Sequence, residues 1–208
     1  MNVNPNILKR FIIYMAILTF VMFTVWAFIR SFSNRPPGDY ETEVCDIRLK
    51  DKLYDKAILA ADKAIKKSPN HRGAMMCKSL VFISQKKYSE ATDQLSFLIN
   101  FLEENLDDDD RTGIGTLAAA YANRGIIKDR NKNYLGALED YIKALGIDHE
   151  AVAGPGLGTV ILNYKYKSSS VKERALYLNE QLQLPENERV LSIKELDEGQ
   201  VMHKPGKL

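Results

Sequence analysis

Residues 118–148 read AAAYANRGIIKDRNKNYLGALEDYIKALGID, and this stretch decides the fold. Its second half places Tyr134, Ala137, Tyr141 and Ala144 at spacings of three and four residues. Such spacings put apolar side chains on one face of an α-helix. The first half forms another apolar helical pattern, in which Gly125 permits close contact with a neighbouring helix. The stretch therefore predicts two packed α-helices joined by a short turn.

The same pattern recurs along the chain. An aromatic residue followed by small or apolar residues at positions +3, +7 and +10 begins at Tyr54, at Tyr88 and at Tyr134. The first two copies are 34 residues apart and the next two are 46 residues apart, which equals one repeat plus an insertion of 12 residues. A weaker fourth copy, 34 residues after the third, places Val171, Ala175 and Leu178 at the positions +3, +7 and +10. An unrelated helical bundle is the alternative, but three copies favour a repeat.

These copies resemble the tetratricopeptide repeat (TPR) family. Its 34-residue unit is a helix pair with a Gly in the first helix, an Ala in the second and a Pro at the end. Gly125 and Ala137 match the family pattern, and His149 occupies the Pro position of the same unit. Cys45 and Ser79 stand where the family prefers Gly in the two earlier units.

The resemblance covers residues 39–185 and implies an all-α fold, a helical-repeat solenoid of three to four helix pairs. Ser170 and Glu173 have the form of a capping box, which supports a helix that starts at Val171. We expect residues 186–208 to form an irregular terminal cap or tail, because the last apolar face would otherwise meet water. The expected pairs are Tyr40–Leu49 with Tyr54–Lys67, Arg72–Gln85 with Tyr88–Glu104, Arg111–Arg130 with Tyr134–Leu145, and Leu157–Lys167 with Val171–Leu182.

An N-terminal segment, Phe11–Ile29, reads FIIYMAILTFVMFTVWAFI and contains no charged residue, Gly or Pro. As a helix it is about 28 Å long, close to the thickness of the hydrocarbon core of a bilayer. We expect an uncleaved transmembrane anchor, because a cleaved signal peptide has a shorter apolar region. A buried core helix is a weaker alternative, because the segment is apolar on every face. Residues 30–39 form a Pro-rich joint that cannot continue the helix.

Basic residues flank the apolar segment equally, with Lys9 and Arg10 before it and Arg30 and Arg35 after it. The positive-inside rule therefore separates the two orientations only weakly. We expect residues 1–10 to be a cytoplasmic tail and the repeat domain to be translocated. The corresponding location is the bacterial inner membrane with the repeat domain in the periplasm, and a cytoplasmic repeat domain is the alternative.

Composition excludes several classes of function. The chain of 208 residues has a net charge of +2, and beyond residue 35 it holds 25 basic and 27 acidic residues. A near-neutral body argues against a nucleic-acid binder. Two cysteines exclude a disulfide scaffold and a cysteine-only zinc site. Cys45 and Cys77 differ by two positions in the repeat frame, so we expect buried free thiols, although an oxidising compartment would allow a bridge.

Two polar motifs are weak candidates for chemistry. The acidic run Asp107–Asp110 lacks the spacing and the turn glycine of a calcium loop, whereas Asp110 is a good cap for the next helix. Gly154, Gly156 and Gly158 follow no strand and precede no Lys-Ser/Thr pair, so they do not predict a phosphate loop. No nucleophile lies beside a base in the sequence. We therefore expect no catalytic residue, no cofactor and no metal, and the chain is not expected to be an enzyme.

The remaining candidate site is the concave face of the repeat. In the TPR family the first helices of successive repeats line a groove that binds peptides or partner helices. The alternative is that residues such as Met76 and Leu80 simply pack within the stack. Some family members clamp a C-terminal carboxylate, and only Asn123 keeps the required type here. The resemblance implies a partner-binding groove lined by Thr42, Asp46, Met76, Leu80, Ile83, Ala122, Asn123 and Ile126.

These features predict a membrane-anchored protein–protein interaction module that acts as a scaffold or assembly factor for membrane or envelope protein complexes. A mitochondrial receptor with an N-terminal anchor is a second form of this hypothesis. The alternative is a permanent accessory subunit of a larger membrane enzyme complex. The partners would be proteins, as an amphipathic helix or peptide in the groove or as membrane subunits beside the anchor. The tail Val201–Leu208 is equally compatible with a docked and a free end.

Overall fold

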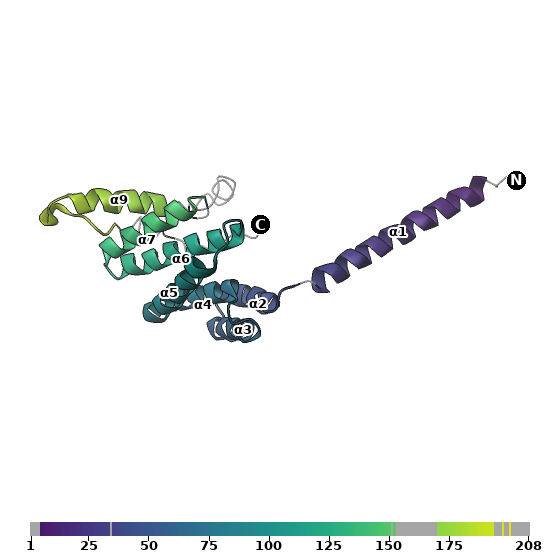
Figure 1. Cartoon of the computed structure of the whole chain (residues 1–208), viewed down its shortest axis with the longest axis horizontal. Coiled ribbons are helices and arrows are strands. Elements are labelled where there is room, and N and C mark those ends of the chain that lie inside the picture. The colour runs from purple at the N-terminus through teal and green to yellow at the C-terminus, as the bar shows by residue number, and fades with distance from the viewer. Residues whose placement is uncertain are drawn as a thin grey trace.

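A computed structural model describes residues 5–33, 35–150, 152, 170–193, 197 and 200 of the chain. These residues form an apolar N-terminal helix followed by a TPR-like solenoid of helix pairs (Figure 1). The predicted helix Leu157–Lys167, the glycines 154, 156 and 158, and the tail Val201–Leu208 lie outside the described residues. The elements are α1 (Pro5–Ser33), α2 (Asp39–Lys50), α3 (Tyr54–Lys67), α4 (Arg72–Ser84), α5 (Tyr88–Asn105), α6 (Arg111–Arg130), α7 (Tyr134–Ile147), α9 (Val171–Gln183) and the 3-10 helix η1 (Glu186–Glu188).

The helix boundaries expected for the described part of the repeat agree with the structure to within two residues. Local side-chain caps explain part of this agreement. The side chains of Asp110 and Asn133 accept the backbone N–H three residues later and so cap α6 and α7. Ser170 and Glu173 form the predicted capping box at the start of α9, with both hydrogen bonds at 3.1 Å. These caps satisfy backbone donors that the first turn of a helix leaves without partners.

The helix α1 lies apart from the solenoid in Figure 1. It contains a candidate membrane span, Pro5–Arg30, with a mean hydropathy of 2.4 and no part of its apolar window buried. A membrane anchor and a signal sequence share these properties. At the joint, the backbone N–H of Asp39 donates to the carbonyl oxygen of Pro36 at 3.2 Å, and Gly38 has a φ of 96°. A side chain at Gly38 would lie 2.7 Å from the ring of His71, so this turn requires glycine.

The three turns within the helix pairs have the same backbone. Lys52, Lys86 and Lys132 have φ values of 59°, 60° and 63°, in the left-handed region. In each turn the lysine N–H and the following N–H donate back to carbonyl oxygens of the last helical turn, which is the Schellman arrangement. The repeat that the sequence pattern predicts is therefore also a repeat of backbone conformation.

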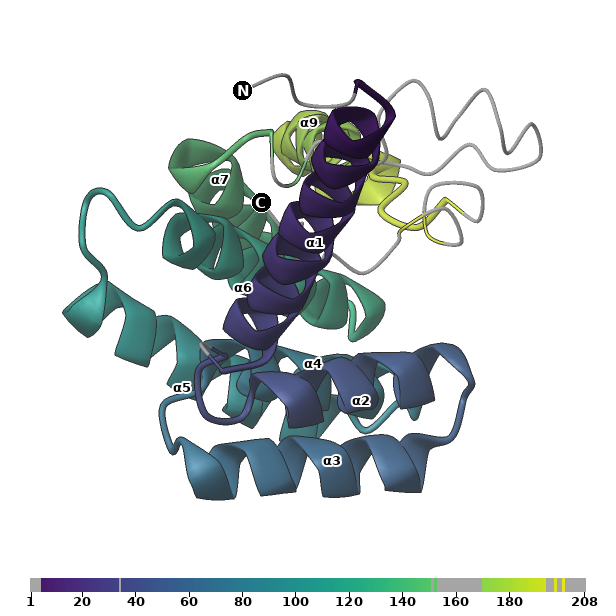
Figure 2. The same ribbon diagram turned by 90° about the vertical axis from the view of Figure 1, so that its right-hand side faces the viewer.

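Two clusters of buried side chains hold the solenoid together. The main core is built from α4, α5, α6, α7 and α9 and contains large residues, among them Leu95, Ile126 and Tyr141. A smaller cluster lies between α2, α3 and α4, which run side by side in Figure 2, and we call it the first-pair core. Its buried residues are Cys45, Ala57, Ala60, Ala61, Cys77 and Val81.

The close contact predicted at Gly125 is present. A β-carbon at this position would lie 2.7 Å from two ring atoms of Tyr141 and 3.3 Å from the carbonyl oxygen of Ala137. The ring of Tyr141 is fully buried, so it cannot move away without disturbing the main core. Glycine therefore sets the spacing between α6 and α7.

Candidate functional site

The structure brings six of the eight predicted groove residues together on the facing sides of α4 and α6. All six are buried, with exposed fractions of 4% or less. The amide nitrogen of Asn123 on α6 lies 3.6 Å from the sulfur of Met76 on α4 and links the two helices. These side chains pack within the stack, which is the arrangement that the sequence analysis gave for Met76 and Leu80 as the alternative to a groove. The six are Met76, Leu80, Ile83, Ala122, Asn123 and Ile126.

The other two predicted groove residues lie on α2, and both are half-buried. The Thr42 hydroxyl donates to the carbonyl oxygen of Gly38 at 2.9 Å and lies 3.5 Å from Nδ1 of His71. Thr42 therefore belongs to the joint that leads from α1 into the repeat. A partner-binding role for the eight residues stays a prediction.

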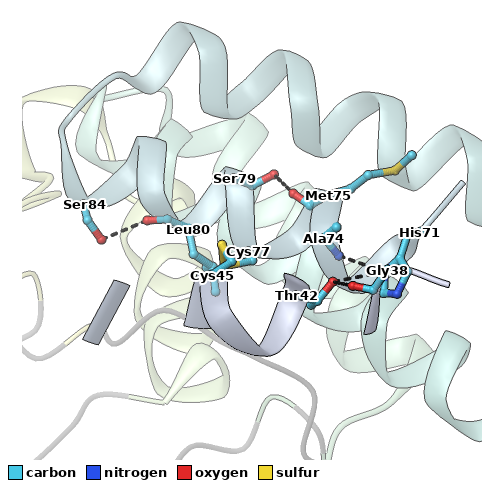
Figure 3. Close-up of a disulfide and its surroundings, with 10 residues drawn as sticks. All are labelled: Gly38, Thr42, Cys45, His71, Ala74, Met75, Cys77, Ser79, Leu80 and Ser84. Atoms are coloured by element: carbon cyan, nitrogen blue, oxygen red, sulfur yellow. Dashed lines mark hydrogen bonds between the residues drawn. A yellow bond between two sulfur atoms is a disulfide. The ribbon is translucent and has the colours of Figure 1, made fainter. Parts of the chain in front are cut away.

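Cys45 and Cys77 form a disulfide bond between α2 and α4, with a Cα–Cα distance of 6.4 Å (Figure 3). The expectation of two free thiols was therefore wrong. Side chains at equal positions of the repeat frame point in the same direction in successive repeats, so two side chains that meet across neighbouring helices must occupy different positions. An offset of two positions is about 200° around a helix, and it turns Cys45 and Cys77 towards each other.

A largely buried cluster of polar side chains links α5, α6 and α7. Arg124 on α6 donates to both carboxylate oxygens of Asp140 on α7, at 2.8 and 2.9 Å, and to the hydroxyl of Ser96 on α5 at 3.1 Å. Lys128 lies 2.9 Å from the same carboxylate. The hydrogen bonds with Asp140 raise the pKa of Arg124 further above its ordinary value. This two-pronged pairing fixes the rotation of α6 relative to α7.

Tyr121 lies beside this group and connects α5 with α7. Its buried hydroxyl donates to Glu103 on α5 and accepts from Lys143 on α7 at 3.3 Å. The guanidinium of Arg124 and the ammonium of Lys143 lie 5.2 and 5.0 Å from the centre of its ring. Burial and then the nearby Glu103 raise the pKa of Tyr121, so the phenol keeps its proton and remains a donor.

A fully buried ion pair joins α9 to α6. Both Nε and Nη2 of Arg174 donate to Asp129, each at 2.7 Å. The hydroxyl of Tyr141 donates to Asp129 at 3.2 Å, and the amide of Gln200 donates to both, at 3.0 and 3.1 Å. Arg174 also lies 3.1 Å from Asp197. The ion pair therefore brings together α6, α7, α9 and the two residues Asp197 and Gln200.

The electrostatics of this pair follow from its burial. Burial acts to lower the pKa of Arg174, but the hydrogen bonds and charge of Asp129 outweigh it, so the pKa is raised and the guanidinium stays charged. Burial and the charge of Asp129 hold the pKa of Tyr141 well above its ordinary value. The Arg174–Asp129 ion pair was not predicted from the sequence. The available signal was Arg174 itself, a charged residue directly before Ala175 on the apolar face of its helix.

The segment after α9 lies along α9 and is held through its backbone. Arg174 donates to the carbonyl oxygen of Leu191 at 2.9 Å, and the Val190 N–H donates to the side chain of Gln181 at 2.8 Å. The Tyr177 hydroxyl donates to the carbonyl oxygen of Val190. Side chains of the segment add to these bonds, because Leu191 packs against the main core and Arg189 donates to the carbonyl oxygen of Leu184 at 2.8 Å.

Asp110 acts as the predicted helix cap. It accepts the N–H of Gly113 at 2.8 Å and forms an ion pair with Arg72, which ties α6 to the start of α4. Arg72 first, and then the backbone of Gly113, hold the pKa of Asp110 below its ordinary value. Within the described residues, no group of three or more His, Cys, Asp or Glu side chains is arranged to hold a metal ion.

No known protein-family model matches the sequence, and no curated protein matches it. Among solved structures, the TPR domain of Arabidopsis OM64 is similar to this chain, with 18% sequence identity and a TM-score of 0.45. The match covers 55% of this chain and 84% of that domain. These values are too low to carry a residue role, a ligand or a partner to this chain.

Proposed function

We propose that this chain is a membrane-anchored protein–protein interaction module that acts as a scaffold or assembly factor for membrane or envelope protein complexes. Solenoids of helix pairs present extended surfaces on which other proteins bind. The exposed apolar helix α1 supports an anchor, because its Pro5–Arg30 span has the length and hydropathy of a bilayer crossing. A short joint connects the two parts and keeps the repeat close to the membrane.

The observation that carries the proposed location is the Cys45–Cys77 disulfide. Disulfides persist in oxidising compartments and are rare in the cytosol. The bond therefore supports a translocated repeat domain, with residues 1–10 on the cytoplasmic side. In a bacterial cell this location is the inner membrane with the repeat in the periplasm.

The proposed groove follows the first helices of the repeat. In this proposal Thr42 and Asp46, which are half-buried, contact the partner directly. The six buried residues on α4 and α6 set the spacing and curvature of the surface on which the partner lies. The partner is a protein segment, and the anchor raises its local concentration near membrane subunits.

One experiment separates the scaffold from its alternative. The full chain, tagged after Leu208, is extracted in mild detergent, sized, and the co-purifying proteins are identified. A monomer-sized peak with several weak, salt-sensitive partners is the expected result. A stoichiometric membrane complex that survives high salt would instead identify a permanent accessory subunit of a larger membrane enzyme.

The location is tested separately by the thiol state in cells. Bacterial cells that express the full chain are quenched in acid, and free thiols are then labelled with a reagent that adds mass. We expect both cysteines to escape labelling until a reductant is added. Labelling of both cysteines without reductant would place the repeat in the cytoplasm.

A further inference from the structure

Neither sulfur of the disulfide is accessible in the folded protein. Cys45 and Cys77 both have an exposed fraction of 0%. Thiol–disulfide exchange requires a thiolate to attack a sulfur atom through a mixed disulfide, so the reagent must reach that sulfur. In the folded arrangement no donor of oxidising equivalents can reach either cysteine. The bond must therefore form while α2 and α4 are apart.

The contacts around the bond are small. Apart from the two cysteines, the fully buried part of the first-pair core consists of three alanines and Val81. The larger side chains that pack against it are only partly buried: Val44, Leu49, Tyr54 and Ile58. The stabilisation from burial grows with the apolar area removed from water, and alanines and partly exposed side chains contribute less area than the large, fully buried side chains of the main core. Two polar contacts also join the pair to α4: Lys78–Asp62 at 2.7 Å and His71–Asp39 at 2.9 Å. Nearly half of each aspartate side chain is exposed, so both contacts contribute little.

We propose that the α2–α3 pair docks onto α4 only after Cys45 and Cys77 have been oxidised, and that the chain is a substrate of a disulfide-donating thiol oxidoreductase. One cysteine thiolate attacks the donor disulfide, forms a mixed disulfide and releases one donor thiolate. The other cysteine thiolate then attacks the bound cysteine sulfur, closes the intramolecular bond and releases the second donor thiolate. Two thiols of the chain are oxidised, the donor disulfide is reduced to two thiols, and the two protons pass to the donor.

Oxidation also changes how α1 is connected to the main core. The α2–α3 pair stands between α1 and the main core along the chain. Before oxidation, the main core would be connected to the membrane through an undocked pair. After oxidation, the bond between α2 and α4 fastens the membrane-proximal end of the repeat to the rest. Closure of the disulfide is therefore the step that completes the solenoid at this end.

The test uses the full chain in detergent micelles, reduced under denaturing conditions and returned to native buffer with reductant. Two quantities are compared with the oxidised chain: the alkylation rate of both cysteines by iodoacetamide, and amide hydrogen exchange in α2–α3 and in α6–α7. We expect alkylation within about tenfold of the unfolded rate. We expect exchange in α2–α3 to be at least about 100-fold faster than in the oxidised chain, with α6–α7 unchanged. Thiols and α2–α3 amides as protected as in the oxidised chain would overturn the proposal.

Oxidised glutathione serves as the disulfide donor in the second arm. Its addition should close the bond and restore protection of α2–α3. The double variant Cys45→Ala/Cys77→Ala should stay in the fast-exchanging state with and without glutathione. The matched control is Val81→Ala, which removes apolar contact from the same core but keeps the bond, and it should retain most of the protection.

Full protection of α2–α3 in the double alanine variant would also overturn the proposal, because docking would then not need the bond. These measurements use purified protein, so they require neither the compartment nor the partner of the proposed function. If the extraction experiment contradicts the scaffold role, the proposal that oxidation precedes docking is unaffected. If the exchange experiment contradicts that proposal, the scaffold role is likewise unaffected.

Discussion

The α2–α3 pair is attached to α4 through small or partly exposed apolar side chains and a disulfide. In contrast, α9 is attached to α6 and α7 through fully buried apolar side chains and a buried ion pair. Both the disulfide and the ion pair are buried, and both link residues far apart in the sequence. The Cys45–Cys77 bond joins residues separated by 32 positions, and the Arg174–Asp129 hydrogen bonds join residues separated by 45.

The two attachments stabilise the fold by different physics. A disulfide acts mainly on the unfolded state, whose conformational freedom it restricts. A buried ion pair acts in the native state, where each charge is tolerated only because the other is present. The first attachment therefore depends on the redox conditions around the protein, and the second depends on geometry. Mutations can separate these two dependences.

The largest effect is expected from Arg174→Met, which leaves Asp129 charged and buried without its partner. Removing one member of a buried pair costs about 3–5 kcal/mol of the free energy of unfolding. Urea unfolding of the full chain in detergent measures it. The control Asp197→Asn removes only a partly exposed contact of the same guanidinium and should cost less than about 1 kcal/mol. A small loss for Arg174→Met would mean that Asp129 reaches water.

A slightly smaller effect is expected from Cys45→Ala/Cys77→Ala. For a loop of this length the restriction of the unfolded chain is worth about 3–4 kcal/mol. In urea unfolding, the free energy of unfolding of the oxidised wild type should exceed that of the reduced wild type by a similar amount. Equal urea midpoints for the oxidised and reduced wild type would show that the bond does not strengthen this end of the repeat.

An intermediate effect is expected from Gly125→Ala, which forces a methyl group against the buried ring of Tyr141. Overpacking of this kind costs about 1–3 kcal/mol. Gly146→Ala is the matched control, because nothing lies within 4 Å of a β-carbon built there. The control should be neutral or more stable, because alanine is the better helix former. Equal stability of the two variants would contradict the spacing role of Gly125.

The smallest effect is a gain in stability. Lys132→Gly relieves a left-handed backbone conformation that L-residues adopt at a cost, so we expect the protein to gain about 0.5–1 kcal/mol. Lys132 follows Asp129 by three residues, and its backbone N–H donates to the Asp129 carbonyl oxygen at 2.9 Å, a bond that glycine can also make. Lys63→Gly, the same substitution inside α3, should instead destabilise by about 1 kcal/mol. Thermal unfolding of both variants measures the difference, and a loss for Lys132→Gly would contradict the reasoning.

Most of the helices could be predicted from the sequence because their signals are local. Apolar spacing identified the helical faces, and caps such as Asp110 and Ser170 identified the starts of helices. Gly125 could be assigned to a close helix contact because the repeat frame places it in the first helix of a pair, whereas its contact with Tyr141 came from the structure. The groove residues on α4 and α6 were predicted from the repeat frame, whereas their burial depends on how closely the two helices approach.

By itself, the sequence determined the repeat, its helix boundaries and an apolar segment long enough to cross a bilayer, because periodicity, caps and composition are properties of neighbouring residues. Only the tertiary structure decided that Cys45 meets Cys77 and that Arg174 meets Asp129. Both contacts depend on the stagger and crossing of helices, which no spacing within one helix records. The features that fasten the two ends of this solenoid are therefore the ones that required the fold.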